Sequence, residues 1–273
     1  MLVSNFLMAN DLKLTKQDLP ESHSDWTHRS LFRPLPDSVI HVWCASLEYP
    51  PPQLAEFLSL LSADEKARAD RFYFETDRSR FVMGRGLLRI LLSRYLGVEP
   101  SQLEFVYGSH GKPALKSETL DKVLEFNVSH SKDQALYIFS WNHKVGVDVE
   151  YVYPLPDLDN FAELFFSPRE CAYIHSLSGE EKQSIFFKLW TCKEAFLKAN
   201  GSGLTVPINQ VEISLGMEGS ALVGTIDGNT EETERWHLET FNPIPGYQAS
   251  LAVEGYDGLS ILQQNVNKSH MRF

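Results

Sequence analysis

The sequence predicts an α+β fold built from two similar lobes, each a small antiparallel sheet packed with helices. Short runs of β-branched and aromatic residues are typical of strands, and two long stretches with helical spacing each end at a glycine. Runs of both kinds follow in a similar order in the two halves of the chain, which indicates related lobes. Of the 273 residues 43% are hydrophobic, enough to form a substantial core.

Four segments are expected along the chain: an N-terminal extension over 1–37, an N-terminal lobe over 38–145, a C-terminal lobe over 146–255 and a C-terminal tail over 256–273. The extension mixes polar residues with prolines and shows no sustained period. No role is assigned to the extension or the tail.

The first lobe is predicted to begin with the strand VIHVWCA at Val39. Ser62 and Glu65 form a capping box at the start of a helix, and a longer helix over 77–96 ends at Gly97. The strand-like runs LEFVY, VLEFNVS and QALYIFS follow, and a turn leads into VGVDVE. This succession predicts an antiparallel meander.

The second lobe begins with two further capping boxes. Ser167 and Glu170 flank Pro168 at the first helical position, and Ser178 with Glu181 precedes a helix that ends at Gly201. The strand-like runs VEISL, ALVGTI, WHLETF and SLAV then complete the lobe.

Composition excludes several classes of protein. The net charge of −11 argues against a nucleic-acid partner, which would need a basic surface. No apolar run reaches the roughly 18 to 20 residues of a membrane span, and the N-terminus lacks a basic lead, so we expect a cytoplasmic protein without a membrane partner. The cysteines Cys44, Cys171 and Cys192 show no metal-type spacing, which fits a reducing compartment.

The run VGVDVE places two carboxylates on one strand face. A period of two puts Asp148 and Glu150 on one side and Val147 and Val149 on the other. These carboxylates form either an ordinary solvated face or a site for a hard cation such as magnesium, which prefers carboxylate oxygens.

The helical segment KLWTCKEAFLK adds a third carboxylate. Trp190, Glu194 and Lys198 follow at i, i+4 steps on one helix face, with Lys193 beside them. The alternative is a surface ion pair between Glu194 and Lys198, worth a few tenths of a kcal/mol.

Two short segments offer phosphate-binding groups. FNVSHS presents Ser129, His130 and Ser131 at the end of a strand, although a histidine near a turn is often structural. In the turn Gly111-Lys112-Pro113 the lysine either meets a phosphate or faces water.

Taken in order, these segments resemble the 4'-phosphopantetheinyl transferases of the larger, surfactin-synthetase-activating type. The resemblance covers residues 39–253. It is carried by GKPAL (111–115), NVSHS (127–131), GVDVE (146–150), FSPRE (166–170) and WTCKEAFLK (190–198). The combination of GxDxE with WxxKExxxK about forty residues later is specific to this family.

The resemblance implies two lobes related by a pseudo-twofold axis, with coenzyme A in the cleft between them. Asp148, Glu150 and Glu194 match the family's magnesium ligands, with manganese as an alternative ion. Lys198 matches the lysine at the pyrophosphate. Matches to coenzyme-binding positions are Ser129 and His130 at the 3'-phosphate, with Arg80, Lys112 and Pro113 on the phosphate or adenine side, and Arg68 where the family often has lysine.

The implied reaction moves 4'-phosphopantetheine from coenzyme A to a serine of an acyl or peptidyl carrier protein and releases 3',5'-ADP. Lys198 and Lys193 would add electrostatic stabilisation, and Glu194 is the candidate general base. Carriers of fatty-acid, polyketide and nonribosomal-peptide synthesis are not distinguished. We expect a monomer, because both lobes lie in one chain.

Two other functions stay open. A catalytically silent relative would bind coenzyme A or a carrier as a sensor, and its expected mark is loss of an acidic ligand. An unrelated magnesium-dependent phosphohydrolase would also use clustered carboxylates, but it gives no reason for the NVSHS and GKP segments.

Overall fold

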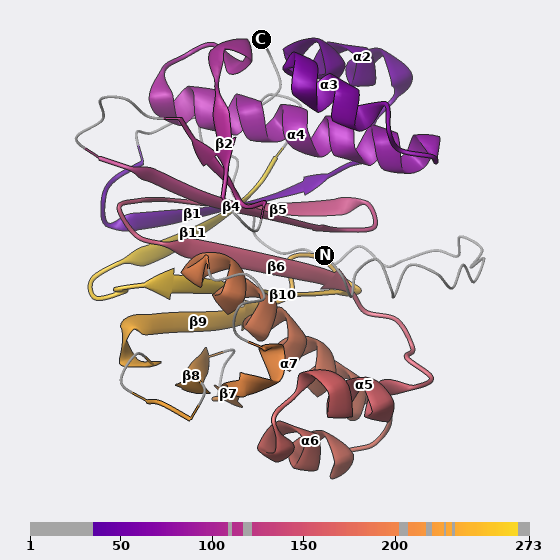
Figure 1. The fold of residues 1–273 in the computed structure, drawn as a ribbon, viewed down its shortest axis with the longest axis vertical. Helices are drawn as coiled ribbons and strands as arrows, with labels where there is room; N and C mark the ends of the chain where they lie inside the picture. Colours follow the sequence, from indigo (N-terminus) through magenta and orange to yellow (C-terminus); the bar gives the residue numbers. More distant parts are fainter. Residues whose placement is uncertain are drawn as a thin grey trace. The chain divides into compact units, whose positions relative to one another are not determined.

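Two β-sheets lie at the centre of the fold, with strand orders β11-β1-β5-β4 and β6-β10-β9-β8-β7 (Figure 1). The computed structural model describes residues 35–108, 111–116, 122–201, 207–216, 220–226, 228–230 and 233–266. The predicted N-terminal extension before residue 35 and the tail after residue 266 therefore lie outside the described residues.

The two halves of the described chain repeat one order of elements: a strand, two short helices, a helix of 22 residues, a 3-10 turn and four strands. The first half consists of β1 (Val39–Ser46), α2 (Pro51–Leu60), α3 (Ala63–Ala69), α4 (Glu75–Leu96), η1 (Pro100–Gln102), β2 (Phe105–Tyr107), β3 (Pro113–Leu115), β4 (Leu124–Ser131) and β5 (Gln134–Trp141). The second consists of β6 (Val145–Tyr151), α5 (Leu158–Phe165), α6 (Pro168–His175), α7 (Gly179–Asn200), η3 (Ile208–Gln210), β7 (Val211–Leu215), β8 (Ser220–Ile226), η4 (Thr233–Arg235) preceding β9 (Trp236–Phe241), and β10 (Tyr247–Glu254). The prediction of an α+β fold with two similar lobes is confirmed.

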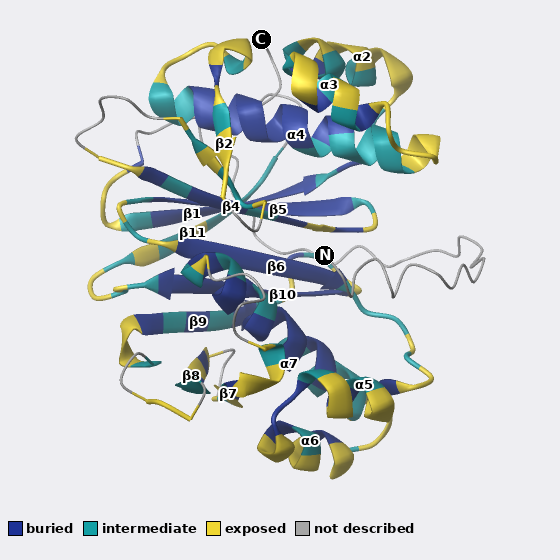
Figure 2. Ribbon diagram, in the orientation of Figure 1, coloured by how far each residue is buried: buried dark blue, intermediate teal, exposed yellow. Residues whose placement is uncertain are grey.

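The sheets pack face to face, with a long helix outside each. Ile40 and Val42 of β1 share a buried cluster with residues of β6 and β10, whereas Trp43 and Ala45 pack on the side of α4. Alternate side chains of β1 thus serve two cores. Figure 2 shows the result: β5 and β6 are buried along nearly their whole length.

Most predicted helix ends are confirmed. Gly97 and Gly201 cap α4 and α7 with φ of +67° and +73°, values at which glycine has no steric penalty. The capping boxes at Ser62 and Ser167 are present. The box at Ser178 is wrong: its side chain makes no cap hydrogen bond, because Gly179 follows at φ +57°, outside helical geometry.

Strand pairing differs from the predicted meander. β4 and β5 form a hairpin, but β2 pairs with β3, and β6 leaves the first sheet to pair with β10. The segment 256–266, to which the sequence assigned no element, contains β11 (Ser260–Asn265), which runs parallel to β1 and makes the first sheet mixed. No helix in the described part of the chain has both the length and the apolar character of a membrane span.

Candidate active site

The backbones of helix α7 and strand β6 are in direct contact at Gly146. A Cβ atom at this position would stand 2.0 Å from the carbonyl oxygen of Ala195 and 2.5 Å from the amide nitrogen of Ala199. Only a glycine permits this approach. As a consequence, the carboxylates of β6 lie beside the segment of α7 that carries Glu194 and Lys198.

Asp148 and Lys198 form the centre of the site. Lys198 Nζ lies 2.6 Å from Asp148 Oδ1, and the Ser129 hydroxyl donates to the same oxygen at 2.8 Å while accepting from Lys198 at 2.9 Å. The Asp148 side chain is only 4% exposed, and its Oδ2 atom is buried without a hydrogen-bond partner. This burial excludes the solvated-face alternative for Asp148.

The charges of the cluster are unbalanced, because three carboxylates, those of Asp148, Glu150 and Glu194, act electrostatically on the single ammonium of Lys198. Burial, followed by the charge of Asp148, raises the pKa of Glu150 to about 7. Burial also raises the pKa of Glu194, against the opposing effect of Lys198. For Lys198 burial acts to lower the pKa, but the carboxylates outweigh it and the pKa is raised.

These features fit a hard cation in part. A buried carboxylate oxygen without a partner and an excess of negative charge are what such an ion would satisfy. Within the described ranges, however, no three Asp, Glu, His or Cys side chains are arranged as a ready metal site. Lys198 holds Asp148 in the present arrangement, so the predicted set of Asp148, Glu150 and Glu194 stays a prediction.

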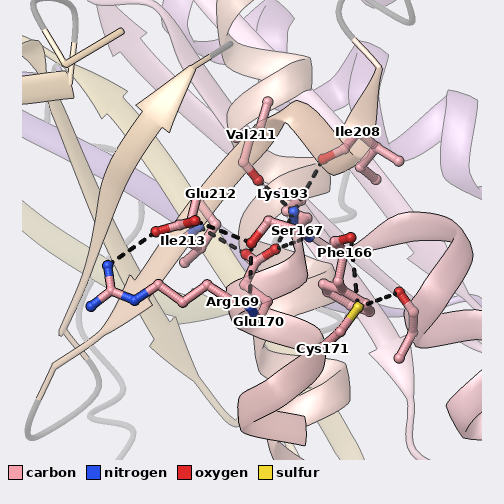
Figure 3. A network of polar contacts seen from close by, with 11 residues as sticks. Phe166, Ser167, Arg169, Glu170, Cys171, Lys193, Ile208, Val211, Glu212 and Ile213 are labelled. Carbon is pink, nitrogen blue, oxygen red and sulfur yellow. Dashed lines mark hydrogen bonds and ion pairs between the residues drawn. The ribbon is translucent and has the colours of Figure 1, made fainter. Parts of the chain in front are cut away.

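Lys193 lies away from the acidic cluster, which corrects the electrostatic stabilisation predicted for it. Its side chain is 0% exposed, and its Nζ lies 2.7 Å from Glu170 Oε2 and donates to the carbonyl oxygens of Ile208 and Val211 (Figure 3). Neighbouring helical residues point about 100° apart, so Lys193 faces η3 and β7 when Glu194 faces β6.

The Glu170 carboxylate connects α6, α7 and β7 in the same network. Its Oε2 accepts from the Ser167 amide at 2.7 Å, and its Oε1 accepts from the Ile213 amide at 2.8 Å. The FSPRE motif is therefore joined to WTCKEAFLK by a buried ion pair, and both glutamate oxygens have partners (Figure 3). This pair has a structural role.

Two of the predicted coenzyme-binding residues, Ser129 and His130, lie on opposite faces of β4. Ser129 faces Asp148, whereas His130, one residue later, is exposed on the opposite face. The charges of Lys198 and Arg80 lie within electrostatic range of the His130 imidazole. Arg80 also pairs with Asp77 at 3.8 Å.

The other predicted coenzyme-binding residues, Lys112, Pro113 and Arg68, make contacts within the protein. Lys112 Nζ donates to the carbonyl oxygens of Lys198 at 2.7 Å and Val145 at 3.4 Å, and burial lowers its pKa. Pro113 pairs with Tyr107 at the start of β3. The guanidinium of Arg68 lies over the Phe81 ring at 5.2 Å. None of these three contacts the acidic cluster among the described residues.

Ser131 was expected only as a candidate phosphate-binding group, and its contact with Glu150 was not predicted. The Ser131 hydroxyl donates to Glu150 Oε2 at 2.9 Å, just as Ser129 donates to Asp148. The signal was present, because Ser129 and Ser131 are two residues apart on a strand and must face the same way.

Comparison with known proteins agrees with the motifs. The 4'-phosphopantetheinyl transferase superfamily matches residues 144–252, and the family "4'-phosphopantetheinyl transferase, N-terminal" matches residues 49–139. The transferase HetI of Nostoc sp. is 42% identical over 217 residues, 80% of this chain and 88% of that protein. The transferase Sfp of Bacillus subtilis is 28% identical over 195 residues, 71% of this chain and 83% of that protein.

The chain belongs to the 4'-phosphopantetheinyl transferase family. Among solved structures, a holo-(acyl-carrier-protein) synthase from Bacillus anthracis in complex with CoA (3',5'-ADP) matches with 22% identity and a TM-score of 0.35. It covers 41% of this chain and 94% of its own.

Proposed function

We propose that this protein transfers 4'-phosphopantetheine from coenzyme A to a serine of an apo acyl or peptidyl carrier protein. The serine oxygen would bond to the β-phosphorus of coenzyme A, the bond to the bridging oxygen would break, and 3',5'-ADP would leave. The observation that carries the proposal is the buried Asp148–Lys198–Ser129 contact, with Glu150 and Glu194 around it, in a chain of this family.

Three carboxylates and one lysine have distinct roles in this proposal. Asp148, Glu150 and Glu194 would hold a magnesium or manganese ion, which when bound neutralises charge on the pyrophosphate. Lys198 adds a positive charge on the same side. Glu194, on α7 one turn before Lys198, is proposed to accept the serine proton.

The coenzyme is proposed to lie beside the positive groups next to this cluster. Ser129 and His130, with Arg80 in electrostatic range, suit the 3'-phosphate, and the further contacts are Lys112, Pro113 and Arg68. In a chain of net charge −11 the cations Arg68, Arg80 and Lys112 would locally favour an anionic ligand. Lys193 has no part in it.

A monomer in the cytoplasm is the proposed state, with lobe boundaries at 38–145 and 146–255. Support for the monomer comes from the repeated order of elements, because one chain supplies both lobes around the site. Neither a membrane nor a nucleic acid is a proposed partner.

The test is incubation with an apo carrier protein, coenzyme A and magnesium, followed by intact-mass measurement. We expect the carrier to gain one phosphopantetheine, and the same assay with Asp148→Ala to show no gain while the variant stays folded. Binding of coenzyme A by the wild type without transfer would instead assign the silent-sensor alternative.

A further inference from the structure

Strand β4 contacts β6 through side chains, although the two strands belong to different sheets. The Asn127 side chain accepts from the Val147 amide at 3.0 Å, and the Ser131 hydroxyl accepts from the Tyr151 amide at 3.1 Å. Between them, Ser129 donates to Asp148. Asn127, Ser129 and Ser131, spaced two apart on β4, thus hold β6 in position through side-chain hydrogen bonds instead of a backbone ladder.

The Ser131 hydroxyl makes two hydrogen bonds, one as an acceptor and one as a donor. It accepts from the Tyr151 amide and donates to Glu150 Oε2 at 2.9 Å, and the residue is 6% exposed. A hydroxyl carries a single proton, and the amide occupies one of its lone pairs, so the proton is directed at the carboxylate. A hydrogen bond with an ionised acceptor is also stronger than one between neutral groups.

We infer that Ser131 is a positioning residue, which holds the Glu150 carboxylate in place beside Asp148 for cation binding. This inference rests on the proposed function. Two hydroxyls, Ser129 and Ser131, are spaced two apart on β4, and they match two carboxylates spaced two apart on β6. Each acid therefore has its own donor.

Loss of the Ser131 hydroxyl has a direct physical consequence. Asp148 repels Glu150, and burial leaves water little opportunity to replace the missing donor. The Glu150 carboxylate would turn away from Asp148. The carboxylate oxygens of Asp148 and Glu150 would then no longer be preorganised to bind the same ion. Removing such an orienting partner typically weakens metal affinity by about 10- to 100-fold.

The experiment is titration of magnesium chloride into the full chain with coenzyme A bound, followed by calorimetry. Ser131→Ala should weaken the magnesium dissociation constant by about 10-fold or more, and Ser131→Thr, which keeps the hydroxyl, should restore most of it. Ser140→Ala is the matched control, because Ser140 on β5 is 0% exposed and its hydroxyl has no hydrogen-bond partner. It should change the constant by less than about twofold.

Transfer assays at rising magnesium separate this role from a structural one. We expect Ser131→Ala to need more magnesium and to recover most of its kcat at saturation. If the Ser131→Ala variant is unfolded, Ser131→Val and Ser131→Thr can be compared instead, because the two side chains have the same size and only threonine keeps the hydroxyl. Equal magnesium affinity in the hydroxyl-free variant and in an active wild type would overturn the inference only, whereas a wild type that transfers nothing would overturn the proposed function.

Discussion

Replacing Lys193 by methionine should destabilise the fold and leave coenzyme A binding by the folded protein unchanged. Its ammonium lies 2.7 Å from Glu170 Oε2, and the two side chains are 0% and 3% exposed. Methionine fills the space of the aliphatic stem but leaves a buried carboxylate with the amides of Ser167 and Ile213 only. Removing one partner of such a pair costs about 3 to 5 kcal/mol, a large part of the stability of an ordinary domain.

Urea unfolding followed by tryptophan fluorescence measures this loss, with Lys182→Met as the control. Lys182 lies on α7 like Lys193 and pairs with Asp159 of α5 at 2.6 Å. The Asp159 side chain is 57% exposed, so the control should lose under about 1 kcal/mol. Adding Glu170→Gln to Lys193→Met removes the uncompensated charge and should recover part of the loss. Equal unfolding free energies for both lysine variants, together with weakened coenzyme A binding, would refute the structural role.

The other predictions concern the site and its support. His130→Ala should weaken coenzyme A far more than 3'-dephospho-coenzyme A in calorimetry, and equal losses would contradict the 3'-phosphate role. Gly146→Ala places a Cβ 2.0 Å from the Ala195 carbonyl oxygen, so we expect about 1 to 3 kcal/mol of destabilisation and reduced transfer; unchanged urea midpoints would disprove the tight contact. Glu194→Gln should lower single-turnover transfer about 100-fold or more with coenzyme A affinity kept, whereas a parallel loss of magnesium affinity would assign a ligand role only. Burial lowers the pKa of His41 from 6.5 to about 4, so the unfolded chain binds the proton first on acidification. The contribution of His41 to the free energy of unfolding should be complete above pH 6.5 and fall by about 3 kcal/mol towards pH 4, which the difference between wild type and a His41→Asn variant measures; the same pH profile in both would argue against this cause.

Local pattern determined the elements of this protein and the faces of its strands. Valines and carboxylates alternate in β6 as expected, with Val147 and Val149 in the apolar cluster between the sheets. Glycine at the predicted ends of α4 and α7 takes the left-handed conformation. The paired motifs on β6 and α7 also indicated the family, because their spacing depends on residues within two short segments.

Tertiary structure decided which neighbour each face meets. A strand presents the same backbone hydrogen-bonding groups to any partner. The segment VGVDVE therefore did not predict that β6 pairs with β10 in the second sheet. In the same way, KEAFLK specified that Lys193 and Glu194 diverge around the helix, but not which of them would face β6. The ion pair between Lys193 and the buried carboxylate of Glu170 on α6 fixes the orientation of α7. With Lys193 turned towards Glu170, Glu194 lies on the side of the site. Sequence periodicity sets the direction of a side chain relative to its own element, and only the packing of distant elements sets what that side chain contacts.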